Sequence, residues 1–209
     1  FFAEIENDLR RVLAYSLNNQ LGFMVVGIGI GTEMALNGTA SHAFAHILYK
    51  ALLFMSVGAV LYRTGTSKAS ELGGLYRTMP RTAMFCLVGA ASISAFPLFS
   101  GFVTKSLILD EAAGQHYPVI WALLVFASAG VLSHSGIKIP FFAFFAHDSG
   151  LRPKEAPMHM QLAMGITAAL CIWIGVFPGP LYALLPYPVE FHPYTTSHVV
   201  AQLHLLLFA

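Results

Sequence analysis

Charged residues are scarce in this 209-residue sequence. Only 10% of its residues are Asp, Glu, Lys or Arg, whereas a soluble domain usually carries about 25%. Hydrophobic residues make up 56%, and the mean hydropathy is +0.68. The net charge is +1 and the basic residues are scattered, not clustered with aromatic residues, so we expect no nucleic acid as a partner. We therefore expect an all-α multi-pass membrane protein embedded in the lipid bilayer.

Cysteine is nearly absent too. Cys86 and Cys171 lie far apart inside apolar runs, without a CxxC pair or Cys/His ligand spacing, so neither a zinc site nor a disulfide framework is predicted. The sequence also lacks a Ser/His/Asp order, a phosphate-cradling glycine loop and a pair of carboxylates. The alternating glycines at 27–31 lie inside an apolar run and not after a strand, which is typical of helix packing. We expect no cofactor, no metal and no enzymatic activity in the chain itself.

Both ends of the sequence look cut. It starts at Phe1 without a methionine, and its first residues do not resemble a signal peptide. It stops at Ala209 within an apolar run. We expect it to be a fragment of a longer protein.

Four apolar stretches fit single membrane crossings, since a crossing needs about 20 mostly apolar residues. They are residues 12–35, 41–62, 118–140 and 159–178. A fifth stretch, 82–112, is too long for one straight helix across the bilayer. Near its middle lie Pro97, which removes a backbone donor, and Gly101, which loosens a helix. The stretch is therefore either a tight two-helix hairpin or one crossing broken in the middle.

The placement of lysine and arginine decides between these topologies, because cytoplasmic loops are enriched in both. Nine of the eleven lie outside the predicted crossings or at their ends: Arg10, Arg11, Arg63, Lys68, Arg77, Arg81, Lys138, Arg152 and Lys154. If 82–112 crosses once, all nine fall on one side, and the linkers near 36–40 and 113–117 on the other side carry none. We predict about five membrane helices, one of them broken at 95–103, with the N-terminus of this chain and the basic loops in the cytoplasm.

The two remaining basic residues, Lys50 and Lys105, lie inside predicted crossings. A charge at bilayer depth costs about 2.5–3.5 kcal/mol, and such residues are candidates for function. Lys105 follows the break, and transporters place ion sites at broken helices. The alternatives are a proline kink that serves packing alone and a lysine that snorkels to the membrane surface. We favour a functional role for Lys105.

His42, His46 and Lys50 follow one another at intervals of four residues, which places them on nearly one helical face over about 12 Å. Imidazole titrates near neutral pH and a buried lysine can lose its proton, so such a row can pass protons. The alternative is two hydrogen-bonded core histidines and a snorkelling lysine. Because Lys50 is too central to reach the surface easily, we predict a proton relay that faces the protein interior.

No carboxylate lies inside a predicted crossing beside these lysines. Glu33, Asp110 and Glu111 are expected to be solvated residues at helix ends. Lys50 therefore needs an acidic partner from outside this chain, or must stay neutral much of the time. His134 either lines the proton path or is a hydrogen-bonded packing residue.

Four ordered motifs resemble a known family. The segment DLRRVLAYS at 8–16, followed by NQLG at 19–22, resembles the "D-x-K-R-x-L-A-Y-S…Q-x-G" element of the proton-antiporter membrane family. That family includes the large antiporter-like subunits of respiratory complex I and the A and D subunits of Mrp cation/proton antiporters. Residues 42–54 resemble its "H-x3-H-x3-K-A-L-L-F" helix, 71–75 its "x-x-G-G-L" loop, and 97–105 its broken helix with a lysine. The resemblance covers about residues 5–180, and residues 141–157 look most like the D subunit of Mrp-type antiporters.

The resemblance implies a fold of about fourteen helices built on two inverted five-helix repeats. This chain would hold most of the second repeat, with residues 1–180 as the C-terminal part of the transmembrane domain. Residues 181–209 would be an irregular tail and the start of a further apolar helix. The first repeat, which in the family carries a Glu and a Lys essential for pumping, would lie outside this sequence.

The motif match also implies roles for single residues. His42, His46 and Lys50 would form the central proton line, and Lys105 would be the lysine at the proton exit. Arg10 stands where many members have lysine, and because arginine does not readily release its proton, we expect an ion pair with Asp8. His134 would be auxiliary, as would Asp8 and Arg10.

The implied function is that of an Mrp-type subunit, which exchanges cytoplasmic Na⁺ or K⁺ for protons within a hetero-oligomer in the bacterial inner membrane. One alternative is a proton-pumping subunit of complex I or of a membrane-bound hydrogenase, in which case the chain would be a component of a translocase. Another is a structural membrane protein that transports nothing.

Overall fold

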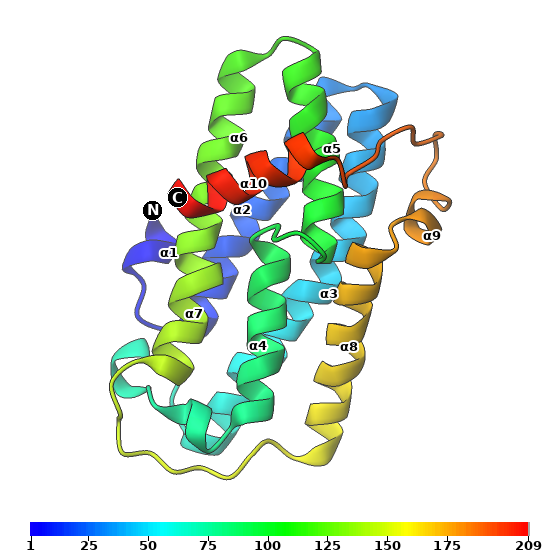
Figure 1. Cartoon of the computed structure of the whole chain (residues 1–209). Coiled ribbons are helices and arrows are strands. Elements are labelled where there is room, and N and C mark those ends of the chain that lie inside the picture. Colours follow the sequence, from blue (N-terminus) through cyan, green and yellow to red (C-terminus); the bar gives the residue numbers. More distant parts are fainter. Residues whose placement is uncertain (209) are drawn as a thin grey trace.

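The computed structural model describes residues 1–208, and this part of the chain consists of helices and loops without a β-sheet, as predicted. Figure 1 shows the long helices side by side, with the C-terminal helix lying across them. The long helices are α2 (Leu9–Ile30), α3 (Glu33–Thr64), α4 (Pro80–Ile93), α5 (Ser100–Gly114), α6 (Pro118–Val131) and α8 (Met158–Val176). The shorter helices are α1 (Phe2–Ile5), α7 (Lys138–Pro140), α9 (Gly179–Tyr182) and α10 (Thr196–Phe208). Two 3-10 turns, η1 (Ala69–Glu71) and η2 (Leu75–Arg77), and two π-helical turns, η3 (Leu132–Ile137) and η4 (Phe141–Phe145), complete the described elements.

Within residues 1–208, three continuous helices are long and apolar enough to cross a bilayer: α3, the run from α6 to η4 (Pro118–Phe145), and α8. They correspond to the predicted crossings at 41–62, 118–140 and 159–178. The second is longer than predicted because η3 and η4 carry the helix on to Phe145. α2, with 22 residues, is long enough as well, but it is less apolar because it contains arginine, asparagine and glutamine.

The predicted linker at 36–40 is wrong, because α2 already ends at Ile30 and α3 begins at Glu33. Gly31 takes the left-handed conformation that ends α2, with φ at 76°. The Thr32 side chain then caps α3 by accepting a hydrogen bond from the backbone N–H of Ala35. Gly38, in the middle of the predicted linker, lies inside α3, where a Cβ would come within 2.9 Å of Ile108 on α5. Its small size therefore serves helix packing.

The stretch 82–112 is one crossing broken in the middle, as predicted. α4 has 14 residues and α5 has 15, so each spans about 21–23 Å, too short for a hydrocarbon core of about 30 Å. Figure 1 shows α5 continuing beyond the end of α4 in the same general direction. Between them, Ala95 and Leu98 take positive φ angles of 57° and 74°. Gly101, in the first turn of α5, lies so close to α4 that a Cβ would lie 1.8 Å from the carbonyl oxygen of Ser92.

α3 lies at the centre of the bundle and packs against α2, α4, α5 and α8. Its residues Tyr49, Leu52 and Leu53 are fully buried in the main hydrophobic cluster. Both cysteines are free, buried thiols in the same apolar interior, as expected from their surroundings in the sequence. The long helix that carries the histidine row is therefore shielded on most sides.

Loops at one end of the bundle gather the basic residues. Asp8 and Lys68 form a β-bridge there, and the Lys138 ammonium donates to the backbone carbonyls of Ala3, Glu4 and Glu6 at 2.5–3.1 Å. In the loop after η4, Asp148 pairs with Arg152 at 2.6 Å and with Arg77 at 3.9 Å. Farther along that loop, the Glu155 carboxylate accepts hydrogen bonds from the Arg81 N–H at 2.8 Å and from the Thr82 hydroxyl at 2.6 Å, at the start of α4.

The expected ion pair between Arg10 and Asp8 is not among the ion pairs of the described residues. Asp8 instead caps α2, because its Oδ1 accepts from the backbone N–H groups of Arg10 at 2.8 Å and Arg11 at 3.3 Å. Its Oδ2 accepts from the Ser67 hydroxyl at 3.0 Å. The carboxylate is thus occupied by backbone and hydroxyl donors, and Arg10 remains exposed.

Candidate functional site: a buried row of titratable side chains

The three residues spaced by four on α3 all face the interior. His42 is 0% exposed, His46 7% and Lys50 4%. The spacing therefore predicted their common orientation. A lysine in such a position has to be hydrogen-bonded or neutral, because an unpaired charge in an apolar interior is strongly destabilising.

Lys50 is the end of a chain of hydrogen bonds that joins three helices. Its Nζ donates to Ser16 Oγ on α2 at 2.8 Å. Ser135 Oγ on η3 also donates to Ser16 Oγ, at 2.9 Å, and His134 Nδ1 lies 2.7 Å from Ser135 Oγ. His134 and Ser135 are both buried. The chain His134–Ser135–Ser16–Lys50 is therefore continuous within hydrogen-bonding distance.

His42 is held on both sides of its ring. Its Nε2 lies 3.2 Å from Gln20 Oε1, which can only accept, and its Nδ1 lies 3.0 Å from Thr104 Oγ1 on α5. The Tyr49 hydroxyl donates to the same Gln20 oxygen at 3.0 Å. Neutral His42 thus keeps its proton on Nε2. Its unprotonated Nδ1 faces α5, the helix that carries Lys105.

His46 lies between His42 and Lys50 on α3. Its ring centroid is 6.3 Å from that of His42 and 5.4 Å from that of Tyr49. Its Nε2 is buried and has no hydrogen-bond partner among the described residues. Such an unsatisfied nitrogen is unusual in a folded interior and is suited to a group that gains and loses a proton or a water molecule.

Lys105, one turn after the break, is 1% exposed. Its Nζ lies 3.2 Å from Ser128 Oγ on α6 and 3.5 Å from the carbonyl oxygen of Ile93, the last residue of α4. The ammonium also lies 4.7 Å from the centroid of the Phe23 ring. The carbonyl at the end of α4 is free to accept from Lys105 because the helix is broken there. Through these contacts, Lys105 connects α4, α5 and α6.

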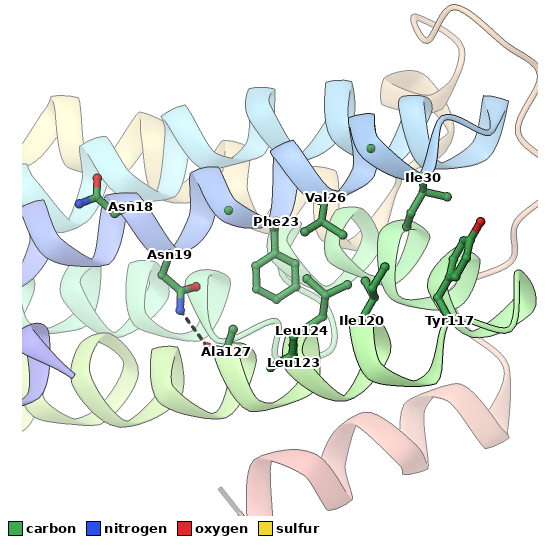
Figure 2. A pocket seen from close by; sticks show the side chains of 12 residues that line it. Asn18, Asn19, Phe23, Val26, Ile30, Tyr117, Ile120, Leu123, Leu124 and Ala127 are labelled. Carbon is green, nitrogen blue, oxygen red and sulfur yellow. Dashed lines mark hydrogen bonds between the residues drawn. The ribbon is translucent and has the colours of Figure 1, made fainter.

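Phe23 separates Lys105 from a largely apolar cavity of about 720 Å³ between α2 and α6. Figure 2 shows the ring directed between these helices, among Val26, Leu124 and Ile120. Asn19 lies toward one end of the cavity and donates to the carbonyl of Ala127 at 3.2 Å. The aromatic ring therefore has the buried cation on one side and this cavity on the other.

No carboxylate neutralises these buried bases within the described part of the chain. All four ion pairs found in residues 1–208 lie at the basic end, in the loops and at the start of α2. The same residues contain no cluster of His, Cys, Asp or Glu that could hold a metal ion. The hydrogen bonds and the ring contact of the buried lysines are thus to serine hydroxyls, one backbone carbonyl and Phe23.

Sequence reasoning did not find the polar side chains that complete the site. Ser16, Gln20, Tyr49, Thr104, Ser128 and Ser135 were not predicted. Ser16 and Gln20 are four residues apart on α2, which is the same signal that marked His42 and His46 on α3. The serines on η3 and α6 carry no such signal, because their partners lie more than 20 residues away in sequence.

The sequence profile of the family described as "NADH:quinone oxidoreductase/Mrp antiporter, TM" matches residues 1–133. The A/B subunit of a probable K⁺/H⁺ antiporter from Rhizobium meliloti is 30% identical over 186 residues, which are 85% of this chain and 18% of that protein. NADH-ubiquinone oxidoreductase chain 5 of Hippopotamus amphibius is 34% identical over 145 residues, 68% of this chain and 24% of that protein. The L subunit of the F420H2 dehydrogenase of Methanosarcina mazei is 32% identical over 187 residues, 82% of this chain and 27% of that protein.

Two solved structures are similar over nearly the whole chain. One is the Mrp complex from Dietzia sp., with a TM-score of 0.84 and 29% identity over 99% of this chain and 24% of that chain. The other is the membrane-bound sulfane sulfur reductase, an archaeal respiratory membrane complex, with a TM-score of 0.82 and 29% identity over 99% of this chain and 37% of that chain. The chain thus spans about a fifth to a third of the length of the proteins it matches.

Proposed function

Because the chain belongs to the transmembrane family shared by NADH:quinone oxidoreductases and Mrp antiporters, we propose that it is part of a subunit that exchanges cytoplasmic Na⁺ or K⁺ for protons. The observation that carries this proposal is the buried Lys50, which is hydrogen-bonded to a serine hydroxyl and has no carboxylate beside it in the described residues. This part of the chain therefore does not fix Lys50 in its charged form, and a counter-charge for the protonated lysine would have to come from the rest of the subunit. The Ser16 hydroxyl can accept a hydrogen bond from the protonated lysine and donate one to the neutral amine.

In this proposal the proton line consists of Lys50, His46 and His42. His42 Nδ1 faces Thr104, the residue before Lys105, so the line continues from α3 to the second half of the broken helix. Lys105 then connects the line to the side opposite the basic loops. His134 acts as an auxiliary group through its serine chain to Lys50, and Asp8 contributes by fixing the start of α2, on which Ser16 and Gln20 lie.

We assign the chain to the Mrp type, and to a protein resembling the D subunit, because residues 141–157 fit that pattern. The antiporter relative in Rhizobium and the Mrp complex structure support the Mrp assignment. The respiratory alternative rests on the relatives that belong to NADH-ubiquinone oxidoreductase and F420H2 dehydrogenase. A set of genes for small Mrp subunits beside the gene of this protein would favour the first, and genes for a redox module would favour the second.

The proposal also covers the orientation of the chain in the membrane, its assembly and its domain bounds. The basic loops support a position of its N-terminal end at the cytoplasmic face of a bacterial inner membrane, and the similar multi-subunit complexes support a hetero-oligomer. Residues 1–180 would be the C-terminal part of the antiporter domain, and 181–209 a tail with the start of another helix. The acidic partner of Lys50 would come from outside residues 1–209. A structure of the complete subunit with Lys50 paired only to residues of this chain would contradict that point.

The experiment uses the complete complex in sealed vesicles with an imposed pH gradient. Addition of Na⁺ or K⁺ should collapse the gradient, and Lys105→Ala should abolish this response because the line loses its last proton carrier. Lys154→Ala is the matched control, since Lys154 is exposed in the basic loop and should exchange normally. If Lys105→Ala exchanges as fast as Lys154→Ala at equal expression, the proposed line is wrong.

A further inference from the structure

The orientation of the Gln20 amide decides which nitrogen of His42 can carry a proton. Gln20 Oε1 lies 3.2 Å from His42 Nε2 and also accepts from the Tyr49 hydroxyl at 3.0 Å. An amide turned end for end would place its NH2 group there instead. A proton on Nε2 would then point at another donor, and neutral His42 would carry its proton on Nδ1. Whatever fixes the Gln20 amide therefore also fixes the tautomer of His42.

Asn19 fixes this amide from the other side. Its Nδ2 donates to the backbone carbonyl oxygen of Ala127 on α6 at 3.2 Å, a contact drawn in Figure 2. Because a carbonyl oxygen can only accept, the Asn19 side chain presents its nitrogen to α6 and its oxygen to Gln20. Gln20 Nε2 donates to that oxygen at 3.0 Å, which leaves Oε1 for His42. One backbone carbonyl thus sets the orientation of both amides.

The other ring nitrogen of His42 faces a hydroxyl that can either donate or accept. Thr104 Oγ1 lies 3.0 Å from His42 Nδ1 and 3.1 Å from the carbonyl oxygen of Ser100. When His42 is neutral, the hydroxyl donates to the unprotonated Nδ1. When Nδ1 gains a proton, it donates to Thr104, and the hydroxyl turns to donate to Ser100. Because Gln20 Oε1 accepts from Nε2 in both states, neither ring nitrogen loses its partner when the ring becomes charged.

The titratable groups that face His42 in the described part of the chain come from α3 and α5. His46 and Tyr49 lie beside it on α3, with ring centroids 6.3 and 6.2 Å away, and Lys105 is the nearby cation on α5. α2 faces it with an amide and a phenyl ring. No carboxylate is among these groups, so a charged ring depends on the two uncharged oxygens that accept from it.

Two consecutive residues of α6 connect this arrangement with the broken helix. The Ala127 carbonyl holds Asn19, and the Ser128 hydroxyl lies 3.2 Å from the Lys105 ammonium. A shift of α6 would therefore change the surroundings of His42 and Lys105 together.

We propose that Asn19 is a positioning residue: by orienting Gln20, it keeps the proton of neutral His42 on Nε2 and leaves Nδ1 as the nitrogen that gains and loses a proton. The tautomer follows from the contacts themselves. Its role in exchange rests on the proton line proposed above.

Nuclear magnetic resonance of the complete complex, labelled with 15N-histidine in bilayers at alkaline pH, measures the tautomer of His42 without any need for transport. The two neutral tautomers give different nitrogen signals, and loss of signals in His42→Gln identifies those of His42. Asn19→Leu removes both polar atoms at similar size, whereas Asn19→Asp keeps an acceptor for Gln20. Asn18→Leu is the matched control, because Asn18 is exposed on the same helix and its side chain makes no hydrogen bond within residues 1–208.

Neutral His42 should give the Nε2–H signals alone in the wild type and in Asn18→Leu. In Asn19→Leu the Gln20 amide can take both orientations, and if these are equally populated, about half of the signal moves to the Nδ1–H form. Asn19→Asp should keep the wild-type signals, because its carboxylate still accepts from Gln20 Nε2. A role in packing alone predicts the reverse order, since the side chain borders a largely apolar cavity. Unchanged signals in Asn19→Leu, or Nδ1–H signals in the wild type, would overturn the proposal.

The role of Asn19 in exchange has a separate readout. At equal expression in sealed vesicles, cation-driven proton exchange should fall about twofold in Asn19→Leu, in proportion to the tautomer that is lost. It should stay at the wild-type level in Asn19→Asp and Asn18→Leu, and wild-type exchange in Asn19→Leu would overturn this role. Because the spectra do not depend on transport, they can contradict the positioning role while Lys105→Ala passes its own test, and the reverse.

Discussion

Replacement of Gly101 by alanine tests whether the contact between the two halves of the broken helix positions Lys105. The added Cβ would lie 1.8 Å from the Ser92 carbonyl oxygen and 3.0 Å from its carbon. Both are backbone atoms, so relief requires α4 and α5 to separate by roughly 1.5 Å to restore van der Waals contact. Overpacking of this kind costs about 1–3 kcal/mol. The same separation would draw the Ile93 carbonyl away from the Lys105 ammonium, which is 3.5 Å from it.

We therefore expect Gly101→Ala to lower the unfolding temperature of the purified complex and to reduce cation-driven proton exchange more than its stability loss explains. Gly114→Ala is the matched control on the same helix, because a Cβ there meets no atom within 4 Å. That variant should be as active and at least as stable as the wild type. Equal stability and equal exchange in the two variants would refute the reasoning.

Two further predictions concern the aromatic ring beside Lys105 and the loop at the basic end. Phe23→Ala should destabilise the protein by about 3–5 kcal/mol in thermal unfolding. Phe23→Leu should recover much of this stability and still exchange slowly, because it lacks the ring that faces the ammonium. Wild-type exchange in Phe23→Leu would show that the ring–ammonium contact has no role. The pKa of the Asp148 carboxyl is held well below its usual value by the Arg152 guanidinium, the Gly150 N–H and Arg77. The ionised carboxylate therefore stabilises the folded loop at pH values above the unfolded-state pKa of about 3.9. This stabilisation is lost as pH falls toward the lower pKa of the folded state. Limited proteolysis of residues 146–157 should thus be faster in Asp148→Asn than in the wild type at pH 7, with the difference shrinking below about pH 4; a difference that is unchanged across this range would contradict the assignment.

The break and the buried row could be predicted from the sequence because both follow from local rules. A stretch too long for one crossing, with Pro97 and Gly101 at its middle, has few alternatives once the basic residues are placed on one side. The interval of four residues from His42 to Lys50 fixes a common face in any helix. The structure agrees with both.

The rest depended on contacts that sequence spacing does not show. Ser16 and Ser135 are 119 residues apart and meet only because α2 and η3 pack together. The turn at 31–32 was expected near 36–40, but packing against α5 requires a small residue at Gly38 within a helix. Asp8 was expected to pair with Arg10, but its position before the first turn of α2 makes capping the stronger interaction.

Cation-driven proton movement in Lys50→Ala and Lys50→Arg, at matched expression in sealed vesicles, tests the central claim that Lys50 is a protonation switch. Removal of a lysine from the membrane interior should not impair insertion. Lys50→Ala should abolish exchange because no other side chain bridges Ser16 and the histidine row. Lys50→Arg should fail nearly as completely, because a guanidinium keeps its proton at any working pH. If Lys50→Arg exchanges at the wild-type rate, Lys50 is a fixed structural cation and the mechanism proposed for this chain is wrong.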